Sequence, residues 1–515
     1  MTSDQLRALN RVQRPPAPPV PRRRLLFTGL ALALLLSELD QTVFATALPT
    51  VVGELSGVQD MLWVNTAYIL TGTVTMPVYG HLSDRLGRKP LLVTGLLVFL
   101  VGSVLGGLAG SMTTLIVARA VQGIGAGSMI ILVQAVVADV VPARDRAPYL
   151  SAIGAVFAVS ALAGPLVGGW LTEGVGWRWA FWLNLPLGAL ALLAVVVLLP
   201  EPPARTPDRS PLDVAGFGTL SLAVTAVVLL AAWGGTRYAW GSPVALGLAA
   251  AALAAGVAFV LVEARAAAPL LPLALFADRT FAAAVVAGLV LAVAMFGTVG
   301  YLPTYLQMVT GLSPMAAGLA MLTLVAGLAL STVGSAQLVR RTGRYRTLPL
   351  VGSGLTALAL GLLATMTPAT PLWLSGGFLF LLGLGIGCAW EVLVVAVQNS
   401  APEAVVGTAT AANSFFREIG VCLGSALVGA LFTARLGSLL AERLPRSGPG
   451  LDSQTLTPAL VQQLPDGLRQ AVAGAYNDAL TPVFALLVPV VLVAVVALLQ
   501  LREVPLATTV RDSRD

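Results

Sequence analysis

The sequence predicts an all-α polytopic membrane protein, on the basis of its composition, its long apolar segments and the placement of its basic residues. Of the 515 residues, 57% are hydrophobic and 10% are charged, and the mean hydropathy is +0.88. A soluble globule of this composition would expose too much apolar surface to water. The bases behind the net charge of +6 are spread over many loops, so no binding to nucleic acid is expected.

Fourteen apolar segments are each long enough to cross a bilayer as a helix of about 20 residues. They lie near residues 25–48, 61–80, 90–110, 112–137, 148–170, 178–199, 214–233, 243–262, 280–303, 315–338, 347–367, 372–397, 407–434 and 479–501. A charged, Pro-rich stretch at 14–24 precedes the first segment, and no small-residue cleavage site follows it. We therefore interpret this segment as a first span rather than as a signal peptide.

The short loops between these segments alternate between basic and nearly uncharged. One set holds the basic residues at 7–24, 85–89, 144–146, 205–209, 265–279 and 340–346. The opposite short loops hold Arg178 and Arg237. Because cytoplasmic loops are enriched in Lys and Arg, we expect the first set and both termini on the cytoplasmic side of the plasma membrane. The loop near 398–406 departs from this pattern, since it holds Glu403 and no base.

A polar stretch at 80–90 separates the second and third segments and combines one acid, three bases and two glycines. A weaker copy at 336–344 follows 256 residues later. This offset corresponds to six spans plus two if the segments at 214–262 are inserted between similar halves, although a chance basic loop could give the same match. We therefore predict a cytoplasmic tail at 1–24, a six-helix bundle at 25–200, a two-helix insertion at 201–265, a second six-helix bundle at 266–502 with a long external loop at 435–478, and a cytoplasmic tail at 503–515.

Ionisable side chains within the first and fourth spans are candidate functional groups, because charge at membrane depth is costly. Glu38 and Asp40 are separated by about 200° around the helix axis, so they face different directions. Counted from the outer ends of their spans, Asp40 and Arg119 lie at similar depths, and an ion pair between them is feasible. Such a pair can take part in proton coupling, or it can be a permanent structural bridge.

The second half repeats this theme with Glu391 in the twelfth span and with Arg417 and Glu418 in the thirteenth. A pair between Glu391 and Arg417 is feasible, and a structural bridge is as good an interpretation as a functional one. The one histidine, His81, lies in the loop at 80–90, where ordinary solvation is expected. No His, Cys, Asp or Glu group has metal-ligand or nucleophile spacing, and no phosphate-binding GxxxxGK[ST] loop occurs, so neither an enzyme nor an ATP-driven pump is indicated.

Five motifs, in order, resemble those of the major facilitator superfamily, and within it the fourteen-helix drug/proton antiporter branch, whose members are multidrug efflux transporters. The resemblance covers essentially the whole chain. The motifs are Gly80, Leu82, Asp84, Arg85, Gly87, Arg88 and Lys89; Leu39 to Thr42 with Ala47, Leu48 and Pro49; Arg119 with Gln122 and Gly123; Gly164 and Pro165 with Gly168 and Gly169; and Trp177, Arg178 and Trp179 with Asn184 and Pro186.

The resemblance implies the major facilitator fold, with two six-helix bundles plus two inserted helices. It also implies that the loop at 80–90 is a conformational latch. Asp84 would meet the start of the thirteenth span, and Arg85 or Arg88 would meet Asp139. Gly164, Pro165, Gly168 and Gly169 would belong to the antiporter helix. Two departures from the family pattern stand out: Ser160 replaces a usual glycine, and Glu38 is an additional acid.

The resemblance further places a substrate cavity between the spans that hold Asp40, Arg119, Met295 and Trp390. Candidate lining residues are Phe44, Tyr68, Gln122, Met295, Phe296 and Trp390. The groups expected to couple protons or bind substrate are Asp40, Arg119, Glu38, Glu391, Arg417 and Glu418.

The expected function is export of small lipophilic molecules, including cations, by alternating access. Inward proton movement would drive it, without a cofactor, in a monomer within the lipid bilayer. One alternative is a dedicated exporter of a single endogenous metabolite, antibiotic, lipid or siderophore. A proton-coupled importer is another, which the Gly164 and Pro165 motif disfavours.

Overall fold

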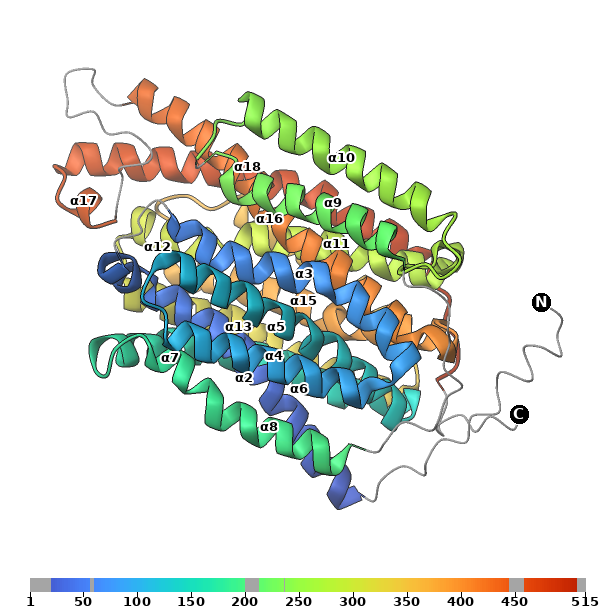
Figure 1. The fold of residues 1–515 in the computed structure, drawn as a ribbon. Coiled ribbons are helices and arrows are strands. Elements are labelled where there is room, and N and C mark those ends of the chain that lie inside the picture. Colours follow the sequence, from blue (N-terminus) through green and yellow to red (C-terminus); the bar gives the residue numbers. More distant parts are fainter. Residues whose placement is uncertain (1–19, 56–59, 200–212, 236, 444–457, 507–515) are drawn as a thin grey trace, which may run out of the picture.

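The computed structural model describes residues 20–55, 60–199, 213–235, 237–443 and 458–506 as an all-helical bundle (Figure 1). Its α-helices are α2 (Val20–Leu55), α3 (Met61–Leu86), α4 (Arg88–Gly107), α5 (Met112–Val140), α6 (Arg146–Glu173), α7 (Trp179–Trp182), α8 (Asn184–Leu198), α9 (Val214–Trp233), α10 (Pro243–Glu263), α11 (Arg279–Val299), α12 (Leu302–Thr310), α13 (Pro314–Thr342), α14 (Thr347–Leu363), α15 (Leu372–Ser400), α16 (Val406–Arg443), α17 (Pro458–Gln462) and α18 (Asp466–Leu499). Short 3-10 turns are η2 (Ala143–Asp145), η3 (Leu273–Ala277) and η4 (Glu403–Val405).

Twelve helices of the described chain are long and apolar enough to cross a membrane, so the protein is a multi-pass membrane protein. The predicted count of fourteen spans is not supported by this measure. The two predicted spans that fail it, 61–80 and 347–367, correspond to α3 and α14. Polar side chains that pack inside the bundle, such as those of Thr66 and Thr73, interrupt the apolar sequence of α3. Helix α14 has 17 residues.

Several helices begin at a side chain that caps their first turn. Ser111 and Ser242 accept hydrogen bonds from the backbone N–H groups at the starts of α5 and α10. Asp213 and Asp278 do the same for α9 and α11. These caps satisfy backbone donors that a helix start leaves unpaired, and they fix where each helix leaves its loop.

The long helices form two groups. In the first half, α2 to α8, helix α2 packs on α6 and α8, and α5 packs on α3 and α4. In the second half, α11 to α18, helix α11 packs on α16 and α18, and α15 packs on α13 and α14. The halves meet where α3 and α5 contact α16 and where α6 contacts α13 and α15. We call this contact the seam.

Helices α9 and α10 form a pair on one flank of the bundle, with α10 outermost (Figure 1). Helix α9 packs on α3 and α16 and so covers one edge of the seam, whereas α10 packs chiefly on α9. Their bounds agree closely with the two predicted segments between the halves.

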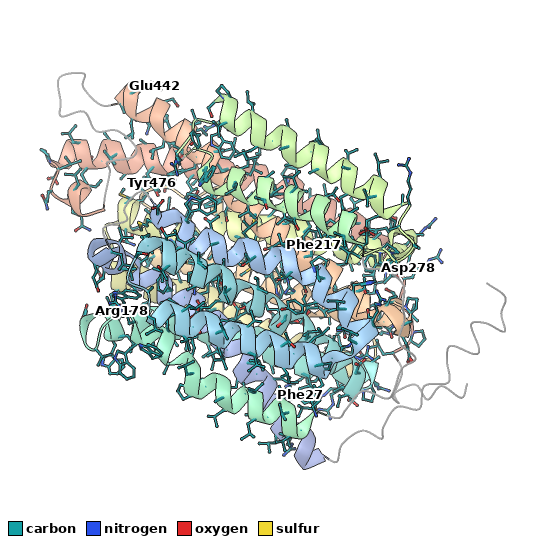
Figure 2. The ribbon with its side chains drawn as sticks, viewed as in Figure 1. Phe27, Arg178, Phe217, Asp278, Glu442 and Tyr476 are labelled. Atoms are coloured by element: carbon teal, nitrogen blue, oxygen red, sulfur yellow. The ribbon has the colours of Figure 1, made fainter. Side chains whose placement is uncertain are left out.

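The bundle has two chemically distinct ends. We call the end that carries Arg88, Arg144 and Arg340 the basic end, and the other the far end. Figure 2 shows Phe27 and Asp278 toward the basic end and Arg178 and Glu442 toward the far end.

The predicted loop at 435–478 is shorter in the structure. Helix α16 continues to Arg443 and α18 begins at Asp466, so most described residues of that segment are helical. The turn at 463–465 separates α17 from α18, and α18 then runs without interruption to Leu499.

Candidate functional site

A buried ion pair in the first half joins Arg119 of α5 to Asp40 of α2. The two side chains are 0% and 1% exposed. Asn184 donates a 2.6 Å hydrogen bond to the Asp40 carboxylate, and Gln122 donates another of 3.2 Å. The contact expected from the depths of Asp40 and Arg119 is therefore present, and amide donors from two further positions complete it.

Two aromatic rings hold the Arg119 guanidinium, whose central carbon lies 5.0 Å from the Phe44 ring centre and 4.2 Å from that of Tyr68. A ring face attracts a cation, and more strongly where water is excluded. Phe44, Tyr68 and Gln122, expected to line a cavity, are thus packed inside the first half around Arg119. In this arrangement the Asp40 charge is fully compensated. Sequence reasoning assigned no role to Asn184.

A second group of charges lies at the seam. Glu38 of α2 is close enough to Arg417 and Glu418 of α16 to interact with both electrostatically. Glu38 therefore faces the second half, whereas Asp40 faces into the first, as expected for residues two apart on a helix.

The predicted pair between Glu391 and Arg417 is not formed: within the described residues no ion pair joins them. The Arg417 guanidinium lies over the Trp390 ring, 4.4 Å from its centre, and its Nη1 atom has no hydrogen-bond partner in the described chain. A Cβ atom at Gly154 of α6 would lie 3.8 Å from Glu391 Oε1, so the carboxylate is directed across the seam.

Glu391 lies close enough to Arg417 to interact with it electrostatically, but the two form no ion pair within the described residues. Its side chain is buried, and neither carboxylate oxygen has a hydrogen-bond partner among the described residues. An ionised carboxylate held in this way would cost several kcal/mol, on the order of the penalty for an unpaired buried charge. Met295 and Phe296 of α11, also expected to line a cavity, are partly exposed.

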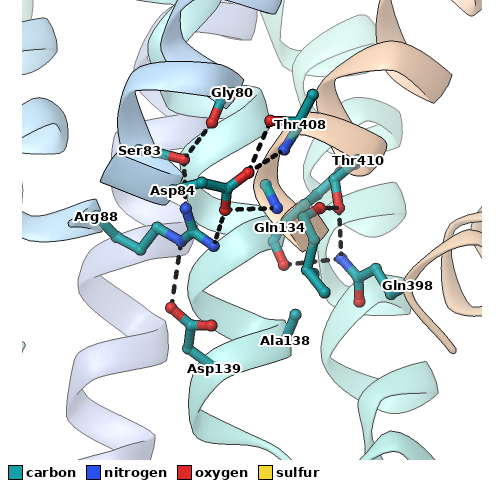
Figure 3. Close-up of polar contacts among 12 residues, drawn as sticks. Gly80, Ser83, Asp84, Arg88, Gln134, Ala138, Asp139, Gln398, Thr408 and Thr410 are labelled. Carbon is teal, nitrogen blue, oxygen red and sulfur yellow. Dashed lines mark hydrogen bonds and ion pairs between the residues drawn. The ribbon is translucent and has the colours of Figure 1, made fainter. Parts of the chain in front are cut away.

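The loop at 80–90 joins the two halves at the basic end (Figure 3). Asp84 accepts hydrogen bonds from the backbone N–H groups of Gly407 and Thr408, of 3.0 and 2.7 Å, and from the Thr408 hydroxyl. These N–H groups belong to the first turn of α16, where a carboxylate is favoured by the helix dipole. Asp84 therefore meets the start of the thirteenth predicted span.

Arg88 connects Asp84 to Asp139 within the first half. Its guanidinium lies 2.7 Å from Asp84 and 3.2 Å from Asp139, and it donates to Ser83. Arg88, one of the two bases considered for Asp139, makes a contact with it. Arg85 and Lys89 are partly exposed on either side of Gly87.

Two glycines of this loop have conformational or steric reasons to be glycine. Gly87 has a φ of 91°, which favours glycine, and it separates α3 from α4. At Gly80, an added Cβ would overlap Ala411 and lie 3.0 Å from the Gly407 carbonyl oxygen. At Gly80 the backbones of α3 and α16 therefore approach each other closely across the seam.

Further polar contacts close the seam at the basic end. Gln398 donates to the Gln134 carbonyl at 3.0 Å, and Ser414 donates to the Gln134 side chain at 3.2 Å. Arg144 donates to the carbonyls of Arg340 and Arg341, each at 3.1 Å. Sequence reasoning missed the two glutamines, although an amide within an apolar span was a usable signal.

The expected antiporter helix, α6, packs on α2. An added Cβ at Gly164 would overlap the Thr42 side chain, whose hydroxyl donates to the Ser160 carbonyl at 3.0 Å. Gly168 is buried and Gly169 has open space beside it. The helix runs without a break through Pro165.

At the far end, Glu54 accepts hydrogen bonds from Trp177 Nε1 at 2.7 Å and from Arg178 Nη1 at 2.6 Å. The hydrogen bond from Arg178 is the main cause that lowers the pKa of Glu54. This contact ties the end of α2 to the loop before α7. The described residues hold no group of three or more His, Cys, Asp or Glu side chains placed to bind a metal ion.

Comparisons with known proteins agree with this architecture. The model of the Major Facilitator Superfamily matches residues 30–425. The uncharacterized MFS-type transporter Rv1877 of Mycobacterium tuberculosis is 42% identical over 96% of this chain and 71% of its own length. The multidrug transporter protein MdtP of Bacillus subtilis is 36% identical over 84% of this chain and 79% of its own.

Among solved structures, the human organic anion transporter MFSD10 (TETRAN) superposes with a TM-score of 0.61 at 16% identity, over 92% of this chain and 100% of that one. At this identity the likeness concerns the fold alone.

Proposed function

Because the chain belongs to the Major Facilitator Superfamily, we propose that it is a proton-coupled secondary active efflux transporter that exports small lipophilic molecules, including cations, by alternating access. The similarity to the multidrug transporter MdtP supports export of more than one compound.

The observation that carries the proton coupling is Glu391, a buried carboxylate at the seam with no hydrogen-bond partner on either oxygen in the described chain. While the seam encloses it, this group is held with a proton, since the neutral form avoids the cost of an unpaired buried charge. When the seam opens at the basic end, water reaches the group and the proton leaves. Opening and proton release are thereby linked.

Asp40 takes a different part in this mechanism. Arg119, Gln122 and Asn184 compensate its charge, so it holds α2 against α5 and keeps Glu38 facing the seam. Glu38 interacts electrostatically with Arg417 and Glu418 at the seam, and Arg417 covers the Trp390 ring. We therefore assign proton exchange to Glu391 at the seam rather than to Asp40 in the first half.

Latch release accompanies the opening. The hydrogen bonds from Gly407 and Thr408 to Asp84 form only while α3 lies against the start of α16. Breaking them frees the seam at the basic end, and reforming them closes it again after proton release.

In this proposal the basic end is cytoplasmic, because cytoplasmic loops are rich in Lys and Arg, and the described state is closed toward the cytoplasm. The chain acts as a monomer in the plasma membrane with both termini inside. Helices α3 and α14 cross as well, which restores fourteen spans. At about 1.5 Å per residue, the 26 residues of α3 extend about 39 Å, more than the roughly 30 Å hydrocarbon core.

The driving force is adequate for protection of a cell. One proton moving down about 100 mV releases about 2.3 kcal/mol. At about 1.4 kcal/mol per tenfold ratio, this supports between one and two decades of substrate gradient.

The proposal is tested by expressing the protein in a pump-deficient host, screening structurally diverse lipophilic and cationic toxicants, and adding an uncoupler. Protection against several of them that disappears with the uncoupler supports the proposal. Protection that survives the uncoupler refutes proton coupling, and protection against one compound alone identifies a dedicated exporter.

A further inference from the structure

A second candidate binding site lies on the flank of the bundle, away from the seam charges. Helices α9, α10 and α16 and the turn η3 border a partly open cavity of about 440 Å³. We call it the lateral pocket. Its walls include Val224 of α9, Phe259 of α10, Phe276 of η3, and Phe415, Phe416 and Ile419 of α16.

All the side chains that line the lateral pocket are apolar. Water in such a cavity would find no hydrogen-bonding side chain, so its entry is unfavourable. Its volume falls within the range of about 300–1,000 Å³ found for small-molecule sites. The lining also offers no charge or hydrogen-bonding side chain to orient a polar ligand.

The pocket reaches the lipid-facing side of α10. A groove on the outer face of α10 is lined by Leu253, Val257 and Leu261, which are 72%, 53% and 51% exposed. This groove shares Ala252, Gly256 and Val260 with the lateral pocket. An added Cβ at Gly256 would meet no atom within 4 Å, so the mouth is open at this residue.

We propose that the lateral pocket binds one acyl chain of a membrane lipid. The surrounding fluid at this depth is hydrocarbon, which enters an apolar cavity without losing hydrogen bonds. The inserted pair α9 and α10 creates the site, because α10 packs chiefly on α9 and leaves the face of α16 that carries Phe416 for another occupant. The edge-on ring pairs of Phe416 with Phe276 and Phe415 line this space.

The site is separate from the exported molecule of the proposed function. Arg417 lies about 100–160° around α16 from Phe416 and Phe415, so this seam charge and the pocket face different directions. A bound acyl chain supports α16 from outside, while the seam contacts hold it from inside. The inference depends on membrane insertion alone and stands whether or not transport is proton-coupled.

The test reconstitutes the full chain in vesicles of phosphatidylethanolamine and phosphatidylglycerol that contain a phospholipid with a photoreactive diazirine in one acyl chain. After illumination, labelled peptides are mapped. The wild type is expected to be labelled on the α9, α10 and α16 residues of the lateral pocket. Gly256→Trp, which fills the mouth, is expected to lose most of this labelling.

Gly247→Trp is the matched control. Gly247 lies on the same helix, about 180° from Gly256, and also has no atom within 4 Å of an added Cβ. The Gly247→Trp variant should be labelled in the pocket to the same extent as the wild type. If Gly256→Trp does not fold, Ala252→Phe blocks the same mouth. Pocket labelling that Gly256→Trp and Ala252→Phe leave unchanged, or labelling confined to the outer face of α10, overturns the proposal. Pocket labelling that an exported toxicant displaces but excess phospholipid does not would assign the pocket to substrate and overturn it too.

Discussion

The carboxylate of Asp84 accepts two hydrogen bonds of 2.7 Å from Thr408, one from its backbone N–H and one from its hydroxyl group. The two residues are 324 positions apart in the chain and belong to different halves. Because a helix start carries unpaired N–H donors, this one carboxylate both caps α16 and closes the seam. Any movement that separates the halves at the basic end must break this contact.

Asp84→Asn is therefore expected to favour the state open at the basic end. Hydrogen bonds to a charged group contribute about 1.5–3 kcal/mol, so the open population should rise about ten- to a hundredfold. The measurement uses a cysteine placed at the buried position 138, Ala138→Cys, in a protein from which Cys388 and Cys422 have been removed. The rate at which a maleimide labels this cysteine reports how often the seam opens.

Asp145→Asn provides the matched control for this substitution. Asp145 also pairs across the seam, with Arg340 at 3.5 Å, but the two side chains are 49% and 64% exposed. Exposed pairs contribute little, so labelling should change about twofold or less. Equal labelling of wild type and Asp84→Asn would contradict the latch.

Gly80→Ala is expected to act on the same seam by steric overlap. The new methyl group would overlap Ala411 and lie 3.0 Å from the Gly407 carbonyl, so α3 and α16 must move apart. Gly334→Ala, where nothing lies within 4 Å, is the control. The same labelling assay should show faster reaction for Gly80→Ala alone. Slower or unchanged labelling would show that the helices do not close against each other as described.

Asp40→Asn should destabilise the folded protein, because it leaves the Arg119 guanidinium buried without its counter-charge. Removal of one partner of a buried ion pair costs about 3–5 kcal/mol. Thermal unfolding in detergent measures this loss. The double substitution Asp40→Asn with Arg119→Gln removes both charges and should recover much of it. A single variant as stable as the wild type would contradict the view that the pair is structural.

The far-end contact predicts a pH dependence of stability. Arg178 lowers the pKa of Glu54 below its ordinary value of 4.5, so folding favours the ionised form of this carboxyl group. The stabilisation is complete above about pH 4.5 and is lost as pH falls through the lowered pKa of the folded protein. The difference in melting temperature between wild type and Glu54→Gln should therefore shrink below about pH 4.5. A difference that stays constant on acidification would count against this pairing.

The sequence predicted which helices and residues take part in the polar contacts better than it predicted which side chains pair with each other. Asp40 and Arg119 meet because helix depth follows directly from residue number. The family resemblance placed Asp84 at the start of α16 and left Arg85 and Arg88 as alternatives for Asp139, of which Arg88 makes a contact. Rotation about the helix axis and the choice between neighbours depend on tertiary packing. For this reason the stacking of Arg417 on Trp390, rather than its pairing with Glu391, was not predicted.

The same limit applies to the inward-facing threonines of α3 and to the two glutamines at the seam. An average over apolar residues does not show that the threonines of α3 turn inward and find backbone carbonyls, as Thr71 does with Ala120. Gln134 and Gln398 come together across a seam between distant segments, and no local pattern specifies that contact. The lateral pocket likewise arises from how α9, α10 and α16 are arranged in the folded chain.

The central claim is that Glu391 carries the proton that drives export. The direct measurement is substrate transport in proteoliposomes under an imposed pH gradient, compared between wild type, Glu391→Gln and Glu442→Gln. Glu442 is an exposed acid near the far end of α16 and serves as the control. Glu391→Gln should lose gradient-driven transport while it keeps substrate binding and gradient-independent exchange, and Glu442→Gln should behave like the wild type. Gradient-driven transport by Glu391→Gln at the wild-type rate would contradict the mechanism.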